Sequence, residues 1–263
     1  DDGIGRPYEV NNYGGESWGN MSLLTATEKS TNTIYVPLGM KAGVEKVVDV
    51  ARRAGIPDSV EMVASPSVSL GAASPHVIDL ANAYATFAAQ GVYAKPFIIN
   101  EVQGPNKGIL YQGRIQAQEV FRKDVMADLT YALSKVTSSG TAAVVGSRVA
   151  RPTAGKTGTS NDNASAWFNG YTPDVAASVA FYRDDATQSL NGIGGLTSVT
   201  GGSFPARIWA EFAKGYLKNA PVQEFPAPAF IGGTEPINYI NAVPEMDPAL
   251  IPPSPKPTSK KKK

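Results

Sequence analysis

The chain has 263 residues, of which 42% are hydrophobic and 18% are charged, a composition typical of globular proteins and not of disordered ones. It has no cysteine, which excludes disulfide frameworks, cysteine-based metal sites and thiol nucleophiles. Its single histidine, His76, makes a His-rich metal site or a Ser-His-Asp triad hard to build. We therefore expect chemistry that needs no imidazole, no metal and no cofactor.

The net charge of +1 hides an uneven distribution along the chain. Five lysines lie in the last ten residues, and subtracting their charge leaves −4 on the remainder, which does not favour nucleic acid as a partner. The lysine run indicates a solvated tail, with attraction to an anionic polymer or membrane as the alternative. No stretch is long and apolar enough to span a bilayer, and no signal peptide begins at Asp1. Since the chain does not start with Met, we expect a fragment or processed piece.

The first half of the chain predicts a loop followed by helices. Residues 1–20 are rich in Gly, Asn and Tyr and contain turn signals. Helical periodicity begins near Ser22 and continues through Leu38. A second amphipathic stretch over 44–53 ends at Gly55, and a third helix is predicted over 77–90.

The second half predicts an antiparallel sheet between helices. Short strands are expected within 92–115, and a helix over 121–136. Three runs with strand periodicity follow closely enough to form a meander: 153–160, 166–171 and 175–182. A helix over 204–217 is predicted to cover a sheet with four apolar side chains, namely Ile208, Trp209, Phe212 and Tyr216.

The composition changes after residue 220. Ten of the 20 prolines fall in the last 43 residues, where we expect no packed domain. The predicted organisation is thus a domain over 1–220 and a Pro-rich, Lys-ended tail over 221–263. The order of elements indicates an α+β fold, an antiparallel sheet covered by helices.

The segment over 151–160 holds the most informative motif, Lys156-Thr157-Gly158-Thr159. Gly155-Lys156-Thr157 resembles the end of a phosphate-binding P-loop, but Ala150 stands where that loop needs its first glycine. A P-loop must also open a helix, whereas a strand follows here. Another interpretation is a glycine-rich loop that contains a lysine by chance.

The remaining interpretation places these residues on the edge strand of a sheet. Lys156 and Gly158 then point to one face and the two threonines to the other, with twist able to bring both hydroxyls to one groove. Gly158 removes the side chain where a substrate backbone would lie. An ammonium and hydroxyls beside an open edge suit an extended peptide that ends in a carboxylate.

A second motif, Ser30-Thr31-Asn32, is weak alone, because a helix cap or turn explains it. Its order relative to Lys156-Thr157-Gly158-Thr159 resembles the penicillin-recognising serine acyltransferases, which add a Ser-x-x-Lys nucleophile. Further segments resemble class A, bifunctional penicillin-binding proteins in consistent order over about 8–218. These segments are Ser69–Ala88, Gly140–Ala142, Ala154–Thr159, Ala166–Pro173 and Pro205–Trp209.

The resemblance implies a penicillin-binding/serine β-lactamase-like transpeptidase fold, a five-stranded antiparallel sheet with helices on both faces. We expect this chain to hold three of these strands and to be incomplete at its N-terminal side. It implies D,D-transpeptidation of peptidoglycan stem peptides and acylation by β-lactam antibiotics. Ser30 would relay protons and Asn32 would bind the substrate amide. Lys156 would supply positive potential, and Thr157 and Thr159 would hold the terminal carboxylate, with the Thr159 N–H in the oxyanion hole. Gly158 completes the substrate-binding strand.

The chain departs from this family at the nucleophile. The only Ser-x-x-Lys is Ser259 to Lys262, in the tail and in the wrong order. We expect the true motif upstream of this chain, together with a glycosyltransferase domain and a membrane anchor that holds the protein on the extracytoplasmic face. The 263 residues alone are then not acylated. A non-catalytic peptide-binding relative and a carboxypeptidase or β-lactamase-type hydrolase remain the alternatives.

Overall fold

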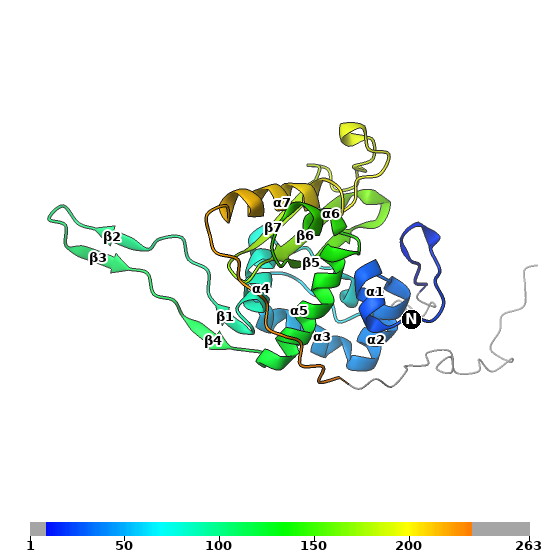
Figure 1. The fold of residues 1–263 in the computed structure, drawn as a ribbon, viewed down its shortest axis with the longest axis horizontal. Helices are drawn as coiled ribbons and strands as arrows, with labels where there is room; N and C mark the ends of the chain where they lie inside the picture. The colour runs from blue at the N-terminus through cyan, green and yellow to red at the C-terminus, as the bar shows by residue number, and fades with distance from the viewer. Residues whose placement is uncertain (1–8, 233–263) are drawn as a thin grey trace, which may run out of the picture. The chain divides into compact units, whose positions relative to one another are not determined.

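Helices begin the chain, two short strand pairs and further helices follow, and the main sheet comes last before a closing helix, as the colour sequence in Figure 1 shows. The structure is a computed structural model and describes residues 9–232. Within that range the α-helices are α1 (Leu23–Lys29), α2 (Asn32–Ala42), α3 (Val44–Ala54), α4 (Val77–Ala88), α5 (Lys123–Ser138), α6 (Ala143–Arg148) and α7 (Phe204–Tyr216). The strands are β1 (Val92–Ala94), β2 (Glu101–Gln103), β3 (Ile109–Gln112), β4 (Ala117–Glu119), β5 (Ala154–Thr159), β6 (Ser165–Tyr171) and β7 (Ala176–Tyr182). The predicted α+β class is confirmed.

The helix boundaries follow local sequence signals. Ser22 caps α1, because its hydroxyl accepts the backbone N–H of Thr25 at 3.1 Å. Gly55 follows α3 with φ of 127°, a conformation that favours glycine. His76 precedes α4 and forms a capping box with Asp79. The prediction of α4 is therefore correct at its start, while its end lies two residues before the predicted one.

The main sheet has the strand order β5-β6-β7 and is antiparallel throughout, as predicted. Its register places Lys156 opposite Asn169, and Asn169 opposite Ser178. Because strand side chains alternate between faces, these three residues share one face, and Thr157 and Phe168 share the other. Among the described residues β5 pairs only with β6, so its outer edge has no strand partner there.

Helices cover both faces of this sheet (Figure 1). On the first face, Tyr171 packs against Tyr84 of α4 and Leu133 of α5. On the opposite face, Phe168 packs edge-to-face on Trp209 of α7, with ring centroids 5.5 Å apart. The first face is the one that carries Lys156.

The predicted packing face of α7 is wrong except at Trp209. Ile208, Phe212 and Tyr216 are 45%, 43% and 66% exposed. The buried side chains of α7 are Pro205, Ala206, Trp209, Ala210 and Ala213. Small residues let the helix backbone approach the sheet closely enough for the Trp209 indole N–H to donate to the Ala177 carbonyl at 3.1 Å. Side-chain size at the contact, and not total apolar content, therefore decides which face is buried.

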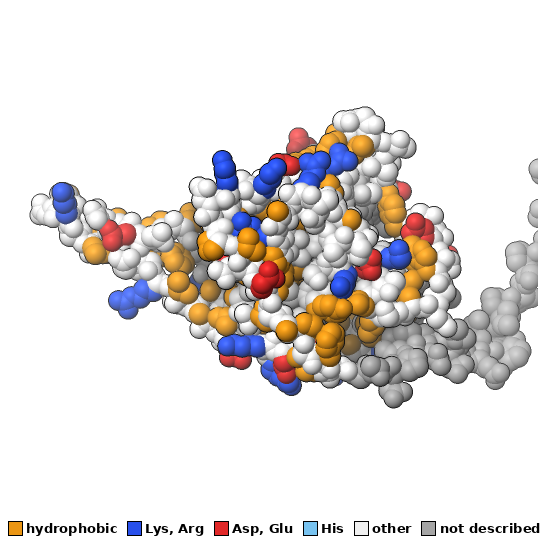
Figure 2. All heavy atoms as spheres, in the orientation of Figure 1, with side chains coloured by type: hydrophobic (Ala, Val, Ile, Leu, Met, Phe, Trp, Pro, Cys, Tyr) orange, Lys and Arg blue, Asp and Glu red, His pale blue; other side chains and the backbone are white. Residues whose placement is uncertain are grey.

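The segment between α4 and α5 forms an arm of two antiparallel strand pairs, β1 with β4 and β2 with β3. Figure 1 shows that the β2–β3 pair lies away from the main sheet. Apolar side chains of the arm are exposed, and Figure 2 shows some of them. The most exposed are Ile98, Leu110 and Ile115.

Residues 221–232 form no helix or strand but are held against α5. The Asp128 carboxylate accepts the backbone N–H groups of Ala229, Phe230 and Ile231 at 2.7 to 2.9 Å. The remainder of the expected tail lies outside the described residues, so the boundary at 220 stays a prediction. No helix within residues 9–232 is long and apolar enough to cross a membrane.

Candidate active site

The structure brings together the two motifs that the sequence analysis selected. Lys156, on β5, donates from Nζ to the hydroxyl of Ser30 at 2.6 Å and to the Thr157 carbonyl at 3.1 Å. These residues come from segments 126 positions apart. The predicted pairing of a cationic sheet edge with the Ser-x-Asn serine is therefore present.

Ser30 reaches Lys156 from the sharp turn between α1 and α2. It is the C-cap of α1 and adopts the left-handed conformation, with φ of 60° and ψ of 52°. A left-handed conformation costs a non-glycine residue about 1–2 kcal/mol. The backbone N–H of Ser30 donates to the α1 carbonyls of Ala26 and Thr27, and these hydrogen bonds hold the turn in place. Strain of this kind is common at functional sites.

The electrostatics of the site are set by burial. Lys156 is partly buried, and the loss of water around its ammonium lowers its pKa to about 8. None of the ion pairs found among residues 9–232 includes Lys156. An uncompensated ammonium beside a hydroxyl can exchange protons much closer to neutral pH than an exposed lysine.

Asn32 begins α2 but contacts neither Ser30 nor Lys156 by a hydrogen bond. Its side-chain amide donates to the Asn11 carbonyl at 2.9 Å. The same loop supplies a cap that sequence reasoning missed, because the side-chain amide oxygen of Asn12 accepts the backbone N–H of Thr33 at 3.1 Å. A cap 21 residues away from its helix leaves no local signal in the sequence.

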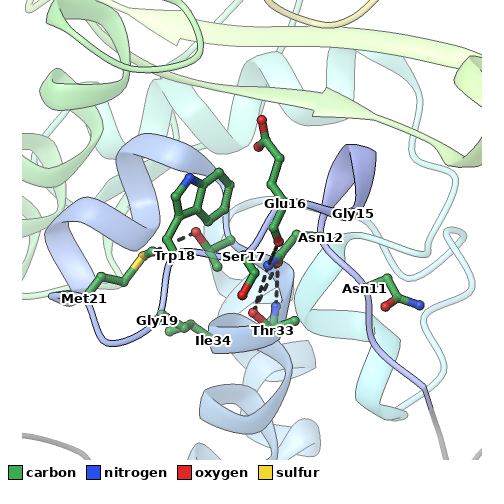
Figure 3. Close-up of a pocket in the computed structure, with 11 residues that line it drawn as sticks. Asn11, Asn12, Gly15, Glu16, Ser17, Trp18, Gly19, Met21, Thr33 and Ile34 are labelled. Carbon is green, nitrogen blue, oxygen red and sulfur yellow. Dashed lines mark hydrogen bonds between the residues drawn. The ribbon is translucent and has the colours of Figure 1, made fainter.

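A polar cavity of about 380 Å³ lies between this loop and the start of α2 (Figure 3). In Figure 3, Asn12 points toward Thr33, while the Trp18 ring and the Glu16 carboxylate project away from α2. The loop also reaches the segment between β7 and α7, since the Tyr13 hydroxyl lies 2.7 Å from that of Ser198.

Thr157 and Thr159 are each bonded to a segment that the sequence analysis did not assign to the site. The hydroxyls of Thr157 and Thr141 lie 2.7 Å apart. The hydroxyl of Thr159 accepts the backbone N–H of Gly201 at 3.2 Å. Between the two threonines, a Cβ on Gly158 would lie 3.3 Å from the Trp167 Cβ. Close packing against the neighbouring strand therefore also favours glycine at this position, besides the room it leaves for a substrate backbone.

The phosphate-loop interpretation of Gly155-Lys156-Thr157 is excluded by the fold. All three residues lie within strand β5, and only a short 3-10 turn over Asn161–Asn163 separates this strand from β6, so they open no α-helix. A P-loop cradles phosphate at the N-terminus of a helix. The site is thus an ammonium and a hydroxyl at a strand edge, which suits acyl transfer to or from an extended peptide.

Comparison with known protein families shows to which family the chain belongs. The model of the penicillin binding protein transpeptidase domain matches residues 3–189. The chain belongs to this transpeptidase domain family. The match includes both motifs of the site, Ser30 to Asn32 and Lys156 to Thr159.

Curated relatives of this transpeptidase chain are penicillin-binding proteins of about three times its length. Penicillin-binding protein 1A of Mycolicibacterium smegmatis is 32% identical over 90% of the chain and 33% of the relative. Penicillin-binding protein 1A of Mycobacterium tuberculosis is 30% identical over 86% of the chain and 30% of the relative. The chain therefore spans about a third of these relatives.

Solved structures agree with the family fold. The penicillin-binding protein PonA1 from Mycobacterium tuberculosis superposes with a TM-score of 0.77 and 28% identity, covering 93% of this chain and 68% of that one. The complex of PonA1 with penicillin V gives a TM-score of 0.75 and 29% identity, covering 83% and 62%. The expected penicillin-binding transpeptidase fold, with an antiparallel sheet between helices, is thus confirmed.

Proposed function

We propose that the chain is part of a peptidoglycan D,D-transpeptidase, a serine acyltransferase that cross-links cell-wall stem peptides and is acylated by β-lactam antibiotics. The observation that carries this proposal is the 2.6 Å contact between Lys156 Nζ and Ser30 Oγ at a sheet edge. The family match and the complex of PonA1 with penicillin V support it.

In this mechanism Ser30 and Lys156 move protons between the nucleophile and the leaving or attacking amine. The short contact places the ammonium beside the Ser30 hydroxyl. The hydroxyl can then pass on a proton, while the ammonium stabilises the negative charge that develops on the oxygen. The lowered pKa of Lys156 supports this role, because proton transfer is most efficient when the pKa lies near the working pH. Asn32 would bind the substrate amide through the part of its side chain that Asn11 leaves available.

Thr157, Gly158 and Thr159 would bind the donor peptide as an added strand along the outer edge of β5. The peptide carboxylate would lie beside Lys156 and the two hydroxyls. The Thr159 backbone N–H would then form half of the oxyanion hole. Gly201, which donates to the Thr159 hydroxyl, would fix the orientation of that side chain.

The nucleophile in this proposal comes from a Ser-x-x-Lys segment of polypeptide outside the chain. The chain itself offers that motif only at Ser259 to Lys262, which lie outside the described residues. The same polypeptide would carry the glycosyltransferase domain and the anchor that holds the site outside the cytoplasmic membrane. Stem peptides, β-lactams and this segment are the partners we propose.

Intact mass spectrometry after incubation with benzylpenicillin tests the proposal. The sample is an extended protein, defined as this chain preceded by its own Ser-x-x-Lys segment. We expect one stable penicilloyl adduct on the extended protein and none on the 263 residues alone. Lys156→Met in the extended protein should slow acylation by about 100-fold or more. The matched control is Lys135→Met. Lys135 stacks on Tyr131 of α5, and its substitution should leave the acylation rate unchanged.

Three outcomes would change the assignment. A stable adduct on the 263 residues alone would show that no outside nucleophile is needed. Absence of an adduct on the extended protein, with retained binding of stem peptide, would favour the non-catalytic relative. Release of free D-alanine without cross-linked product would favour the hydrolase.

A further inference from the structure

Two buried polar atoms without a hydrogen-bond partner lie in the same cross-strand row as Lys156. Within residues 9–232 only three buried side-chain polar atoms lack a partner: Ser69 Oγ, Asn169 Oδ1 and Ser178 Oγ. Buried polar atoms are nearly always paired, so each exception needs a physical reason. Two of the three are direct cross-strand neighbours, and one of those two lies opposite Lys156.

The register fixes how close these groups are. Directly opposed residues of antiparallel strands have their Cβ atoms about 4.5–5.5 Å apart and project from the same face. Lys156, Asn169 and Ser178 therefore form one polar row across β5, β6 and β7. Asn169 is 7% exposed, so its carbonyl oxygen is largely shielded from bulk water.

Lys156 is the charged donor that lies directly opposite Asn169 in the strand register. Its ammonium carries three N–H donors, and two of them are used by Ser30 and the Thr157 carbonyl. The side chain is long and flexible, whereas Asn169 is held on the middle strand of the sheet. Rotation about the Lys156 side chain would therefore carry Nζ from the hydroxyl toward the amide oxygen.

We propose that Asn169 is a positioning residue, whose amide oxygen holds the Lys156 ammonium whenever Ser30 turns its hydroxyl toward the reacting groups. This inference rests on the proposed function for the role of Ser30. The exchange transfers no proton and breaks no covalent bond, because one hydrogen bond of Nζ is replaced by another. Ser178, next in the row, would orient the Asn169 amide by accepting its N–H.

A neutral amide suits this role better than a carboxylate. It accepts a hydrogen bond from the ammonium without becoming protonated and without binding the cation so tightly that Lys156 leaves Ser30. Charged groups do occur on the helices that pack on this face, yet none of them pairs with Lys156. They are Glu28 and Lys29 of α1, Asp79 of α4, and Lys123, Asp124, Asp128 and Lys135 of α5.

A double-mutant cycle on the Lys156 titration tests the inference. The pKa of Lys156 is measured in the 263-residue chain by NMR of ¹³Cε-labelled lysine, with the resonance assigned from Lys156→Met. Ser30→Ala and Asn169→Leu should each change the pKa little, because the other acceptor remains. The double variant should lower it by about 1 or more, since a buried ammonium then has no side-chain acceptor.

Further variants separate positioning from simple proximity. Asn169→Asp should raise the pKa of Lys156 by about 1 or more, because a carboxylate then lies beside the ammonium. Thr130→Val is the matched control: Thr130 is a buried hydroxyl on the same side of the sheet, paired with Tyr171, and its loss should leave the Lys156 titration unchanged. Thermal unfolding checks that each variant is folded.

The outcomes are decisive in both directions. A double variant that differs from wild type by more than the sum of the single changes supports the proposal. Additive changes, or an Asn169→Asp variant with an unshifted titration, would overturn it and assign the Asn169 oxygen to water or another donor. No β-lactam is used, so failure here is separate from failure of the transpeptidase assignment, which acylation tests.

Discussion

Lys156 Nζ donates to Ser30 Oγ at 2.6 Å, although 126 residues separate the two positions in the chain. The contact joins the turn between α1 and α2 to the edge strand of the sheet. Both sides of it are energetically unfavourable alone, because Ser30 is left-handed and Lys156 is desolvated. Such a pair is maintained only by the fold around it, which is the arrangement expected of a site kept for chemistry.

Two substitutions at Ser30 separate the hydrogen bond from the backbone conformation. Ser30→Ala should lower the free energy of unfolding by about 1 kcal/mol, because the hydrogen bond of its hydroxyl is lost while the left-handed turn remains and the Lys156 ammonium keeps another acceptor. Ser30→Gly loses the same bond but removes the steric cost of the left-handed conformation, so it should destabilise by about 1 kcal/mol less. Urea unfolding measures both. A glycine variant less stable than the alanine variant would show that the turn is unstrained.

The pH dependence of stability should report the burial of Lys156. Its folded-state pKa of about 8 lies below the unfolded value near 10.4, so the unfolded chain binds more protons between these values. Stability contributed by this residue therefore rises as pH increases from about 8 to about 10, by at most about 3 kcal/mol. Lys156→Met should abolish the rise. Since other groups titrate in this window, the measured quantity is the difference between wild type and variant in urea unfolding at each pH; a constant difference would contradict the prediction.

Much of the fold could be predicted because its signals are local. Ser22 and Gly55 bound their helices through their own side-chain and backbone chemistry, and period-two runs located the three strands of the sheet. Alternation along β5 also predicted that Lys156 and Thr157 point to opposite faces, as the register shows. These features need only neighbouring residues to be understood.

The rest depends on contacts between distant segments. Asn12 caps α2 from 21 residues away, and α7 packs through its alanines because the sheet surface accepts small side chains. The proximity of Ser30 and Lys156 was expected only from a family resemblance, since neither motif determines it locally. The partnerless oxygen of Asn169 became visible only once the strand register and burial were known.

Asp128 should control the segment that follows α7. Desolvation raises the pKa of its carboxyl, but the backbone N–H groups of residues 229–231 outweigh this and lower it. The lowered pKa means that the stabilising contact is present above the unfolded value and is lost as pH falls through the folded one. Asp128→Ala should therefore speed chymotryptic cleavage after Phe230 at neutral pH. Asp185→Ala, which removes another carboxylate with a lowered pKa, should not; equal cleavage of both variants would contradict the proposed restraint.

Gly201 should tolerate no side chain, because it packs on the backbone of the site. A Cβ there would lie 2.2 Å from the Trp167 carbonyl oxygen and 2.6 Å from that of Gly158. Gly201→Ala must therefore push its loop away from β5 and break the bond from its N–H to the Thr159 hydroxyl, at a cost of about 2–3 kcal/mol. Gly215→Ala is the matched control within α7, where a Cβ meets nothing within 4 Å and alanine should stabilise the helix by about 0.5–1 kcal/mol. Urea unfolding of both variants checks the opposite signs, and in the extended protein only Gly201→Ala should slow acylation by benzylpenicillin.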